Sequence, residues 1–244
     1  MTETLYQLWT KATGFIYSLI TATQDLFAIW SGQLQPEPTW QELSEQNKEM
    51  LRLWQTSNEC STVVIAIQVH TLERDKNRIT EIGLSAWRIT NNSEIQSFSW
   101  RVKENTESKY KRSTEAINQF AFGESHSISE KNIGLILDGE LRWWITHHER
   151  ICVVGHGVSS ALEVLNRHWR LPEHSLVLDT QAIWQYQNRE TDGVSLEECL
   201  GKMPHIGFNP LLLGNAGNES KCIAYLFAAL GQHVEFADKQ NVFL

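Results

Sequence analysis

The first clear pattern of hydrophobic and polar positions is that of β-strands, between residues 61 and 102. STVVIAIQV (61–69) is a nearly continuous β-branched run, which is typical of a central strand buried on both faces. RITEIGLSAWRI (78–89) and IQSFSWRV (95–102) follow after polar turns. We therefore predict a three-strand antiparallel meander.

Further along the chain, helical and strand patterns alternate. A Ser-x-x-Glu capping pattern at Ser127 to Glu130 predicts a helix over 127–146, and RICVVG (150–155) reads as a buried strand. The remaining segments read as helices at 157–169, 181–187, 195–203 and 219–231, with a strand at 176–180. This order predicts an α/β fold, a mixed sheet flanked by helices.

The first 58 residues read as a helical N-terminal extension of a main domain at 59–244. Apolar residues between Leu5 and Ile29 recur at helical spacings, and Thr39 with Glu42 can form a capping box for a second helix over 40–54. Gln24 and Asp25 interrupt the apolar stretch, so we expect no membrane span. Its apolar face is expected to dock on the main domain or on a protein partner.

Charge and cysteine usage exclude some classes of protein. A formal net charge of -8 argues against a protein that coats nucleic acid without specificity, because such binding depends on clustered Lys and Arg. The 4 cysteines are widely spaced and form no CxxC pair, which indicates reduced thiols and no structural zinc. We expect a cytoplasmic or nuclear protein.

Four segments together carry a family resemblance over about residues 61–232. They are IAIQVHTLERDKNRITEIG, VVGHGVSSALEVL, VLDTQAIWQ and GNAGNES, and their order resembles the RNase H-like fold of the DEDDh 3′–5′ exonucleases. They are most similar to the fungal Gfd-type family of exonuclease-like C-terminal domains, whose best-known members are linked to messenger RNA export.

This resemblance implies a catalytic motif that the sequence has lost. Working DEDDh enzymes bring together four carboxylates, which hold two divalent ions, and a histidine that acts as the base. The corresponding positions here are Gln68, His70, Ala161, Gly214 and Glu219, where the family pattern has Asp, Glu, Asp, His and Asp. Only Glu219 keeps a carboxylate, so we expect no metal and no cofactor.

Other polar residues of these motifs have ordinary structural explanations. His156 at a strand end is expected to cap backbone groups, and Asp179 to accept hydrogen bonds from the amides that open the next helix. Glu81 reads as a polar strand residue. His70 and Glu219 could bind a transition metal, but two ligands are too few for a tight site.

One basic stretch, at 99–112, stands out against the acidic background. It surrounds a stacking ring with cations, which is a combination used on single-stranded nucleic acid. The candidate binding residues are Arg101, Lys103, Lys109, Tyr110, Lys111 and Arg112. Glu104 and Glu107 lie in the same stretch, so a solvated loop is the alternative interpretation.

Two functional hypotheses follow from the sequence. The first is a catalytically inactive exonuclease-like domain that binds single-stranded RNA, or a protein partner through its N-terminal helices. The second is an active metal-dependent hydrolase, using Mg or Mn, whose site is rebuilt from Asp179, His156, His70 and Glu219.

Overall fold

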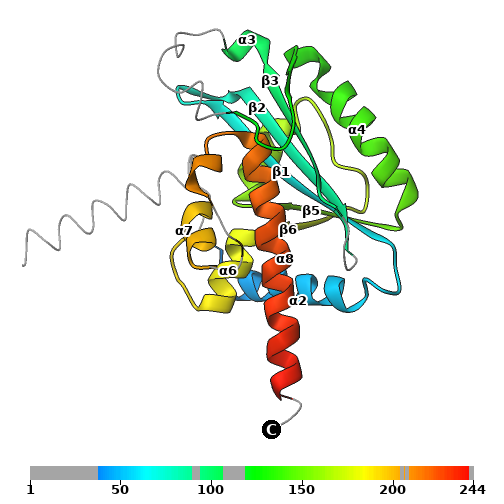
Figure 1. Cartoon of the computed structure of the whole chain (residues 1–244), viewed down its shortest axis with the longest axis vertical. Helices are drawn as coiled ribbons and strands as arrows, with labels where there is room; N and C mark the ends of the chain where they lie inside the picture. The colour runs from blue at the N-terminus through cyan, green and yellow to red at the C-terminus, as the bar shows by residue number, and fades with distance from the viewer. Residues whose placement is uncertain (1–37, 90–93, 107–118, 204–205, 207–208, 242–244) are drawn as a thin grey trace, which may run out of the picture. The chain divides into compact units, whose positions relative to one another are not determined.

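The computed structural model describes residues 38–89, 94–106, 119–203, 206 and 209–241, and those from Trp40 onward form one compact unit. Its centre is a six-stranded sheet in the order β4-β3-β2-β1-β5-β6 (Figure 1). The strands are β1 (Thr62–Leu72), β2 (Asp75–Arg88), β3 (Gln96–Val102), β4 (Ser125–Ile128), β5 (Arg150–Gly155) and β6 (Leu176–Asp179).

Strand direction divides the sheet into two parts. β1, β2 and β3 form antiparallel neighbours, whereas β5 is parallel to β1, β6 to β5 and β4 to β3. The predicted meander and the predicted mixed α/β sheet are both confirmed.

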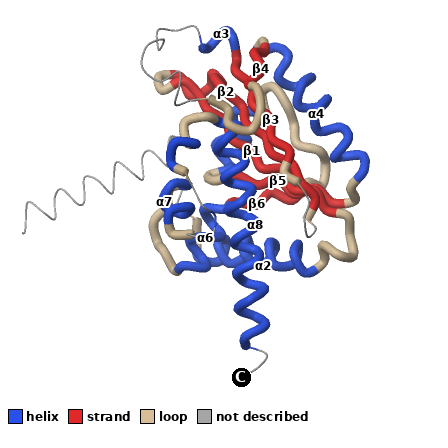
Figure 2. Tube along the Cα trace, viewed as in Figure 1, coloured by secondary structure: helices blue, strands red, loops and turns tan. Residues whose placement is uncertain are grey.

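Helices cover both faces of the sheet, as Figures 1 and 2 show. One face packs against α4 and α5, and the other against α2, α6, α7 and α8. Their bounds are α2 (Trp40–Gln55), α4 (Ile133–His147), α5 (Val158–Leu165), α6 (Thr180–Asn188), α7 (Leu196–Gly201) and α8 (Ala216–Asn241). Short helical turns lie at α3 (Lys103–Thr106), η1 (Glu130–Asn132) and η3 (Pro210–Leu212).

The alternation of side chains along β1 decides what faces α8. Val63 and Ile65 lie in the core beneath α4 and α5, and Val64 and Ala66 lie in the core beneath α8. Because side chains alternate along a strand, the next even-numbered residues also face the α8 side. The end of β1 therefore presents polar side chains to the beginning of α8.

The helix predicted over 40–54 is present as α2, and it packs against the main domain. The ring of Trp40 lies 5.1 Å from that of Tyr186 of α6, and the ring of Trp54 lies 6.2 Å from that of Phe227 of α8, both measured between centroids. The rest of the predicted extension, residues 1–37, lies outside the described residues. Within the part of the chain that is described, no helix combines the length and apolarity needed to cross a membrane.

The helix predicted over 127–146 begins later than its capping pattern indicated. Ser125–Ile128 form β4 and pair with the end of β3, and α4 begins only at Ile133. Ile128 is buried, and Ser125 Oγ lies 2.9 Å from Ser99 Oγ on β3. Strand pairing and burial at the sheet edge thus override the local helix signal.

Gly83 of β2 allows α8 to lie directly on the sheet. A Cβ at this position would overlap the backbone carbonyl of Ala216, the first residue of α8. Polar contacts line the same contact surface, including that of Ser85 Oγ with Ser220 Oγ at 2.9 Å. The glycine therefore fixes the separation between the beginning of α8 and the sheet.

We predict that Gly83→Ala destabilises the domain by about 3 kcal/mol, because the added Cβ meets the backbone of Ala216, which cannot rotate away. Gly201→Ala is the matched control, since a Cβ there meets nothing within 4 Å. Urea unfolding followed by circular dichroism measures both variants. Equal stability of the two would contradict the close approach.

Candidate functional site

The candidate site is an imidazole held between two carboxylates. His70 Nε2 lies 2.8 Å from Glu219 Oε2, and His70 Nδ1 lies 3.5 Å from Glu81 Oε2. β1 supplies the histidine, β2 supplies Glu81 and the first turn of α8 supplies Glu219. An imidazole whose two nitrogens both face carboxylates is favoured in its doubly protonated, cationic form.

Both oxygens of Glu219 are engaged by donors of the protein. Oε2 accepts a hydrogen bond from Gln68 Nε2 at 2.9 Å in addition to its contact with His70. Oε1 accepts a hydrogen bond from the backbone N–H of Gly214 at 2.7 Å. Four of the five family motif positions, Gln68, His70, Gly214 and Glu219, are thus brought together.

Glu81 is a central group of this site, so its interpretation as a polar strand residue was incomplete. The residue is buried, and its Oε2 accepts a hydrogen bond from the backbone N–H of Ala216 at 3.0 Å. Its Oε1 accepts one from Asn215 Nδ2 and lies 3.4 Å from Arg101 Nε. A carboxylate at the first amide of α8 also interacts favourably with the helix dipole.

Strand register places these charges in one row. His70 pairs with Glu81 across β1 and β2, and Glu81 pairs with Arg101 across β2 and β3. The row therefore reads cation, anion, cation on one face of the sheet, and opposite charges at paired positions stabilise a sheet. A sequence signal was available, since Glu81 shares its face with Gly83 and Ser85, small residues that leave room for a helix end.

The elbow before α8 has a backbone that disfavours a side chain at position 214. Gly214 has φ +93°, a conformation that L-residues rarely adopt. Asn215 follows it and accepts a hydrogen bond from the backbone N–H of Asn218 at 3.0 Å. The position where the family pattern has a histidine is therefore shaped for glycine in this chain.

The fifth motif position, Ala161, lies on α5 and is buried. Its methyl group offers neither charge nor a hydrogen bond. Among the residues that the structure describes, no group of three or more His, Cys, Asp or Glu side chains is placed to hold a metal ion.

Two opposing effects determine the protonation of His70. Burial disfavours the imidazolium, but hydrogen bonds and charge interactions with Glu219 and Glu81 outweigh burial and raise the pKa of His70 to about 9. Burial also opposes the charged form of Glu219, and the contact with His70 outweighs it, so the pKa of Glu219 lies below its usual range. At neutral pH the pair is ionised.

His156 and Asp179 have the structural roles that the sequence predicted. Asp179 caps α6 by accepting from the N–H of Gln181, and it also accepts from the N–H of Val158 at 2.9 Å. His156 Nε2 donates to the carbonyl of Val194 at 2.7 Å, and burial lowers the pKa of His156 below its ordinary value.

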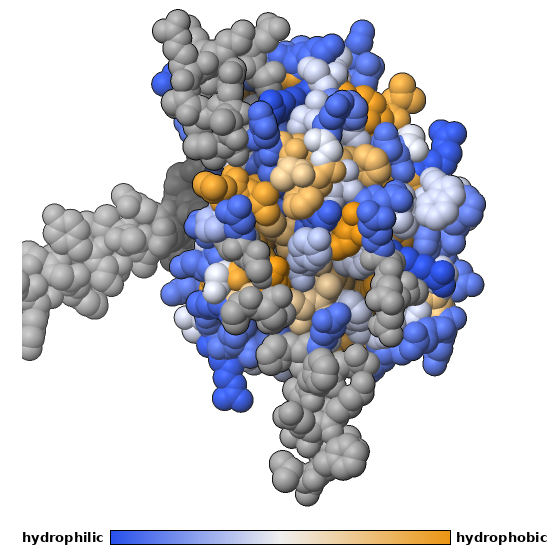
Figure 3. All heavy atoms as spheres, in the orientation of Figure 1, coloured by the Kyte–Doolittle hydropathy of each residue, from blue (hydrophilic) through white to orange (hydrophobic). Residues whose placement is uncertain are grey.

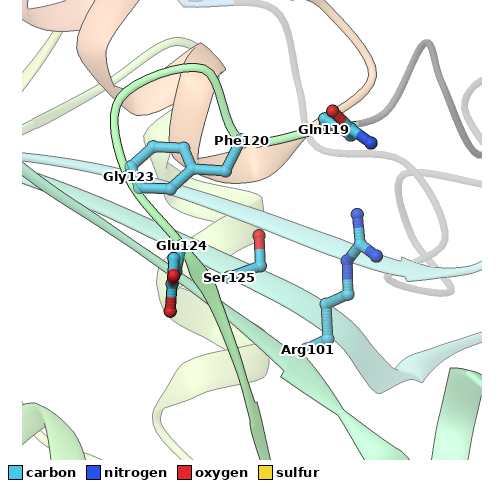
Figure 4. Close-up of a pocket in the computed structure, with 6 residues that line it drawn as sticks. All are labelled: Arg101, Gln119, Phe120, Gly123, Glu124 and Ser125. Carbon is cyan, nitrogen blue, oxygen red and sulfur yellow. The ribbon is translucent and has the colours of Figure 1, made fainter.

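Of the basic stretch, Arg101 and Lys103 lie in the described residues, whereas 109–112 lie outside them. Arg101 lines an open hollow of about 340 Å³ beside the site (Figure 4). Gln119, Phe120, Gly123, Glu124 and Ser125 form the rest of its lining. The guanidinium points toward the segment that carries Gln119, and the carboxylate of Glu124 points away from it.

The fold and the placement of the motif positions define an exonuclease-like domain of the DEDDh class. Residues 63–230 match the family described as DNA polymerase III subunit epsilon-like, C-terminal domain. This match spans most of the chain, and the chain belongs to that family.

Similar solved structures include two Pop2 domains. The RNase domain of the yeast Pop2 protein has 12% identity and a TM-score of 0.42, covering 78% of this chain and 83% of that one. Pop2p of S. pombe, in a form with Mg2+ and Mn2+ bound, has 10% identity and a TM-score of 0.41, covering 76% and 88%. No curated protein matches the chain.

We predict that the ion pairs of His70 stabilise the domain by an amount that depends on pH. The pKa of His70 rises from 6.5 to about 9 on folding, which corresponds to a contribution of about 3 kcal/mol. Because the folded pKa is the higher one, this contribution is complete below about pH 6.5 and is lost as the pH rises toward 9. The lowered pKa of Glu219 acts in the opposite direction, and its contribution is lost as the pH falls through the folded pKa.

Urea unfolding of the wild type and of His70→Gln, at several pH values from about 6 to about 10, measures this contribution. The stability difference between the two proteins should shrink as the pH rises. A difference that stays constant over this range would show that His70 is not charged in the folded protein.

Proposed function

We propose that this chain is a catalytically inactive exonuclease-like domain that acts by binding. The observation that carries the proposal is the position of His70, whose imidazolium lies between the two carboxylates of the site. In a working member of the class, position 70 would carry a glutamate that holds a divalent ion. In this chain it carries a cationic side chain.

The imidazolium makes this arrangement less favourable for metal ions. The two carboxylates and the imidazolium carry a net charge of -1, since -2 + 1 = -1, and Arg101 beside Glu81 adds a further positive charge. A divalent ion about 4 Å from the imidazolium is repelled by it by about 8 kcal/mol at an effective dielectric constant of about 20, which offsets the attraction of one carboxylate at the same distance. The carboxylate oxygens also already accept hydrogen bonds from backbone and side-chain donors.

The catalytic base expected at position 214 is also missing. Gly214 offers no side chain, and its φ of +93° disfavours the histidine that the class uses there. His156 and Asp179, which a rebuilt site would need, are occupied by hydrogen bonds to backbone groups. These contacts argue against hydrolysis at a rebuilt site.

Single-stranded RNA is the ligand that the surface beside the site favours. Phe122 stands in the sequence between Phe120 and Gly123, which line the hollow. Lys221 Nζ of α8 lies 4.0 Å from the centroid of the Phe122 ring. Tyr225 is exposed one turn further along α8. Figure 3 shows hydrophobic and hydrophilic side chains interspersed on the face that α8 crosses. Cations beside exposed rings suit a strand of phosphates and bases.

A protein partner bound through the N-terminal helices remains a prediction, because residues 1–37 lie outside the described residues. The proposal therefore includes RNA and a protein as ligands. The RNA-binding measurements described below test the first of them.

We predict that the purified protein does not degrade single-stranded RNA or DNA in the presence of magnesium or manganese. Magnesium should not raise its melting temperature either, because a ligand that binds only the folded state stabilises it by mass action. A labelled-oligonucleotide assay and a thermal shift measurement test this prediction. Trimming from the 3′ end that depends on metal, and that Glu219→Ala abolishes, would overturn the proposal.

The control variant restores the carboxylates and leaves Gly214 unchanged. It carries Gln68→Asp, His70→Glu, Ala161→Asp and Glu219→Asp. If the motif positions are assigned correctly, removal of the imidazolium and the gain of acids should produce a magnesium-dependent rise in melting temperature. Turnover is not required, because the surrounding groups have their own geometry.

We predict that Arg101→Ala weakens binding of a short single-stranded RNA several-fold and lowers the log-log salt slope by about 0.7, the value for one lost phosphate contact. Tyr225→Ala should weaken binding through lost stacking, by about 1 kcal/mol or more. Arg167→Ala is the charge-matched control, because Arg167 is exposed and follows α5, whose end packs in the core on the other face of the sheet from α8. Fluorescence anisotropy at several salt concentrations measures all three, and equal effects of Arg101→Ala and Arg167→Ala would place the RNA elsewhere.

A further inference from the structure

Helix α4 presents two large apolar side chains to solvent. Leu135 is 73% exposed and Trp143 is 55% exposed, whereas Leu137 and Leu141 on the opposite side of α4 are buried. Both exposed side chains lie on one ridge of the helix, and Gly139 lies midway between them. Exposed apolar groups that share one face of a helix are typical of an association surface.

The spacing of this ridge is symmetric about Gly139. Leu135 precedes the glycine by four residues and Trp143 follows it by four. If two α4 helices cross in antiparallel fashion at Gly139, a two-fold axis relates them and each Leu135 meets the Trp143 of the other copy. Packing of such ridges, spaced by four residues, is the commonest mode of helix contact in globular proteins.

We propose that this ridge is the interface of a homodimer, and that its occupant is α4 of a second copy of this chain. The inference goes beyond the proposed function and does not depend on it.

Gly139 suits the crossing point. A Cβ at this position would meet nothing within 4 Å in the single chain, so the glycine is not required by packing inside the domain. Glycine in the middle of an exposed helix costs about 1 kcal/mol relative to alanine. Close approach of a second backbone at this point would account for its presence.

Charges flanking the ridge complement one another under the same symmetry. Arg142 and Asp138 lie on the same flank of α4 and are both exposed. In the antiparallel pair, Arg142 of one copy comes beside Asp138 of the other, and the two-fold axis generates this ion pair twice. Trp169 Nε1 donates to Asp138 Oδ1 at 2.7 Å and holds this carboxylate in place.

Trp143 is already ordered for such a contact. Its ring stacks on that of His147 at a centroid distance of 4.8 Å, and His147 Nδ1 lies 2.8 Å from the carbonyl of Trp143. A side chain held in this way loses little conformational freedom on binding. The contact is limited to one helix from each copy, so we expect a weak dimer whose population depends on concentration.

Disulfide trapping tests the symmetry axis directly. Gly139→Cys is made in a Cys60→Ser background, because Cys60 is the only cysteine in the described residues that is not buried. Two cysteines at the crossing point should form an intermolecular disulfide under mild oxidation, seen as a dimer on a non-reducing gel. Thr146→Cys is the matched control, since two copies of it would lie about 21 Å apart along the helices at 1.5 Å per residue.

Sedimentation velocity over a range of concentrations provides the second measurement. The wild type should show a dimer that increases with concentration, and Trp143→Ala should weaken association at least tenfold. Gly139→Leu should leave folding intact but prevent association. Leucine raises the helix propensity, and its side chain blocks the close approach of the two α4 helices. We expect its melting temperature to be unchanged or higher, and its dimer to be lost.

Three results would overturn the inference. One is a wild type that stays monomeric at every concentration. Another is cross-linking of Thr146→Cys as efficient as that of Gly139→Cys. The third is a cysteine at position 139 that a maleimide cannot label in the monomer, which would show that another segment of the chain covers the ridge.

Discussion

The contact on which the site depends is the one between His70 and two glutamates from different elements. Glu81 comes from β2 and Glu219 from the beginning of α8, and the imidazolium lies between them. Without a positive charge, two largely buried carboxylates would repel each other. The histidine therefore allows α8 to begin on this sheet with two acidic side chains close together.

The polar beginning of α8 is followed by core residues between Cys222 and Leu230, and its contacts with the sheet explain this change. Glu81 accepts from the first amide of the helix, and Asn215 satisfies the amide of Asn218. A helix end buried without such partners would leave backbone donors unsatisfied. Beyond this turn, Ile223 and Phe227 lie in the hydrophobic core, where burial of apolar side chains holds the helix in place of hydrogen bonds. Gly83 allows the backbone at the beginning of α8 to lie directly on β2, so that both the polar and the apolar contacts can form.

Much of the fold could be predicted from local patterns, and the remainder depended on register. The strands other than β4, the mixed directions of the sheet and the main helices followed from hydrophobic periodicity and turn residues. The partnership of His70 with Glu81 did not, because it depends on irregular pairing near the turn, with register shifts on both sides of Thr71. A regular hairpin continued from the pair Leu72 and Asp75 would place Asn77 opposite His70.

Other differences have the same origin in tertiary contacts. The capping signal at Ser127 is a property of a few neighbouring residues, whereas β4 exists because Ser125–Ile128 pair with β3 and bury Ile128. The role of Asn215 could likewise not be predicted from its neighbours, because its side-chain amide donates to Glu81, which lies more than a hundred residues earlier in the chain. Patterns within a short window cannot report partners that only the folded chain brings together.

Under the proposed function, the positive charge of His70 has a consequence for binding. Divalent ions in a nuclease site can be exchanged or removed, and the site loses its shape and charge with them. The imidazolium of His70 is covalently part of the chain, and its raised pKa of about 9 keeps it charged at neutral pH. The surface beside it, with Arg101 held near Glu81, thus keeps its electrostatic character independently of metal supply. Under the proposed function, the hollow lined by Arg101 is therefore a fixed binding surface that needs no bound metal.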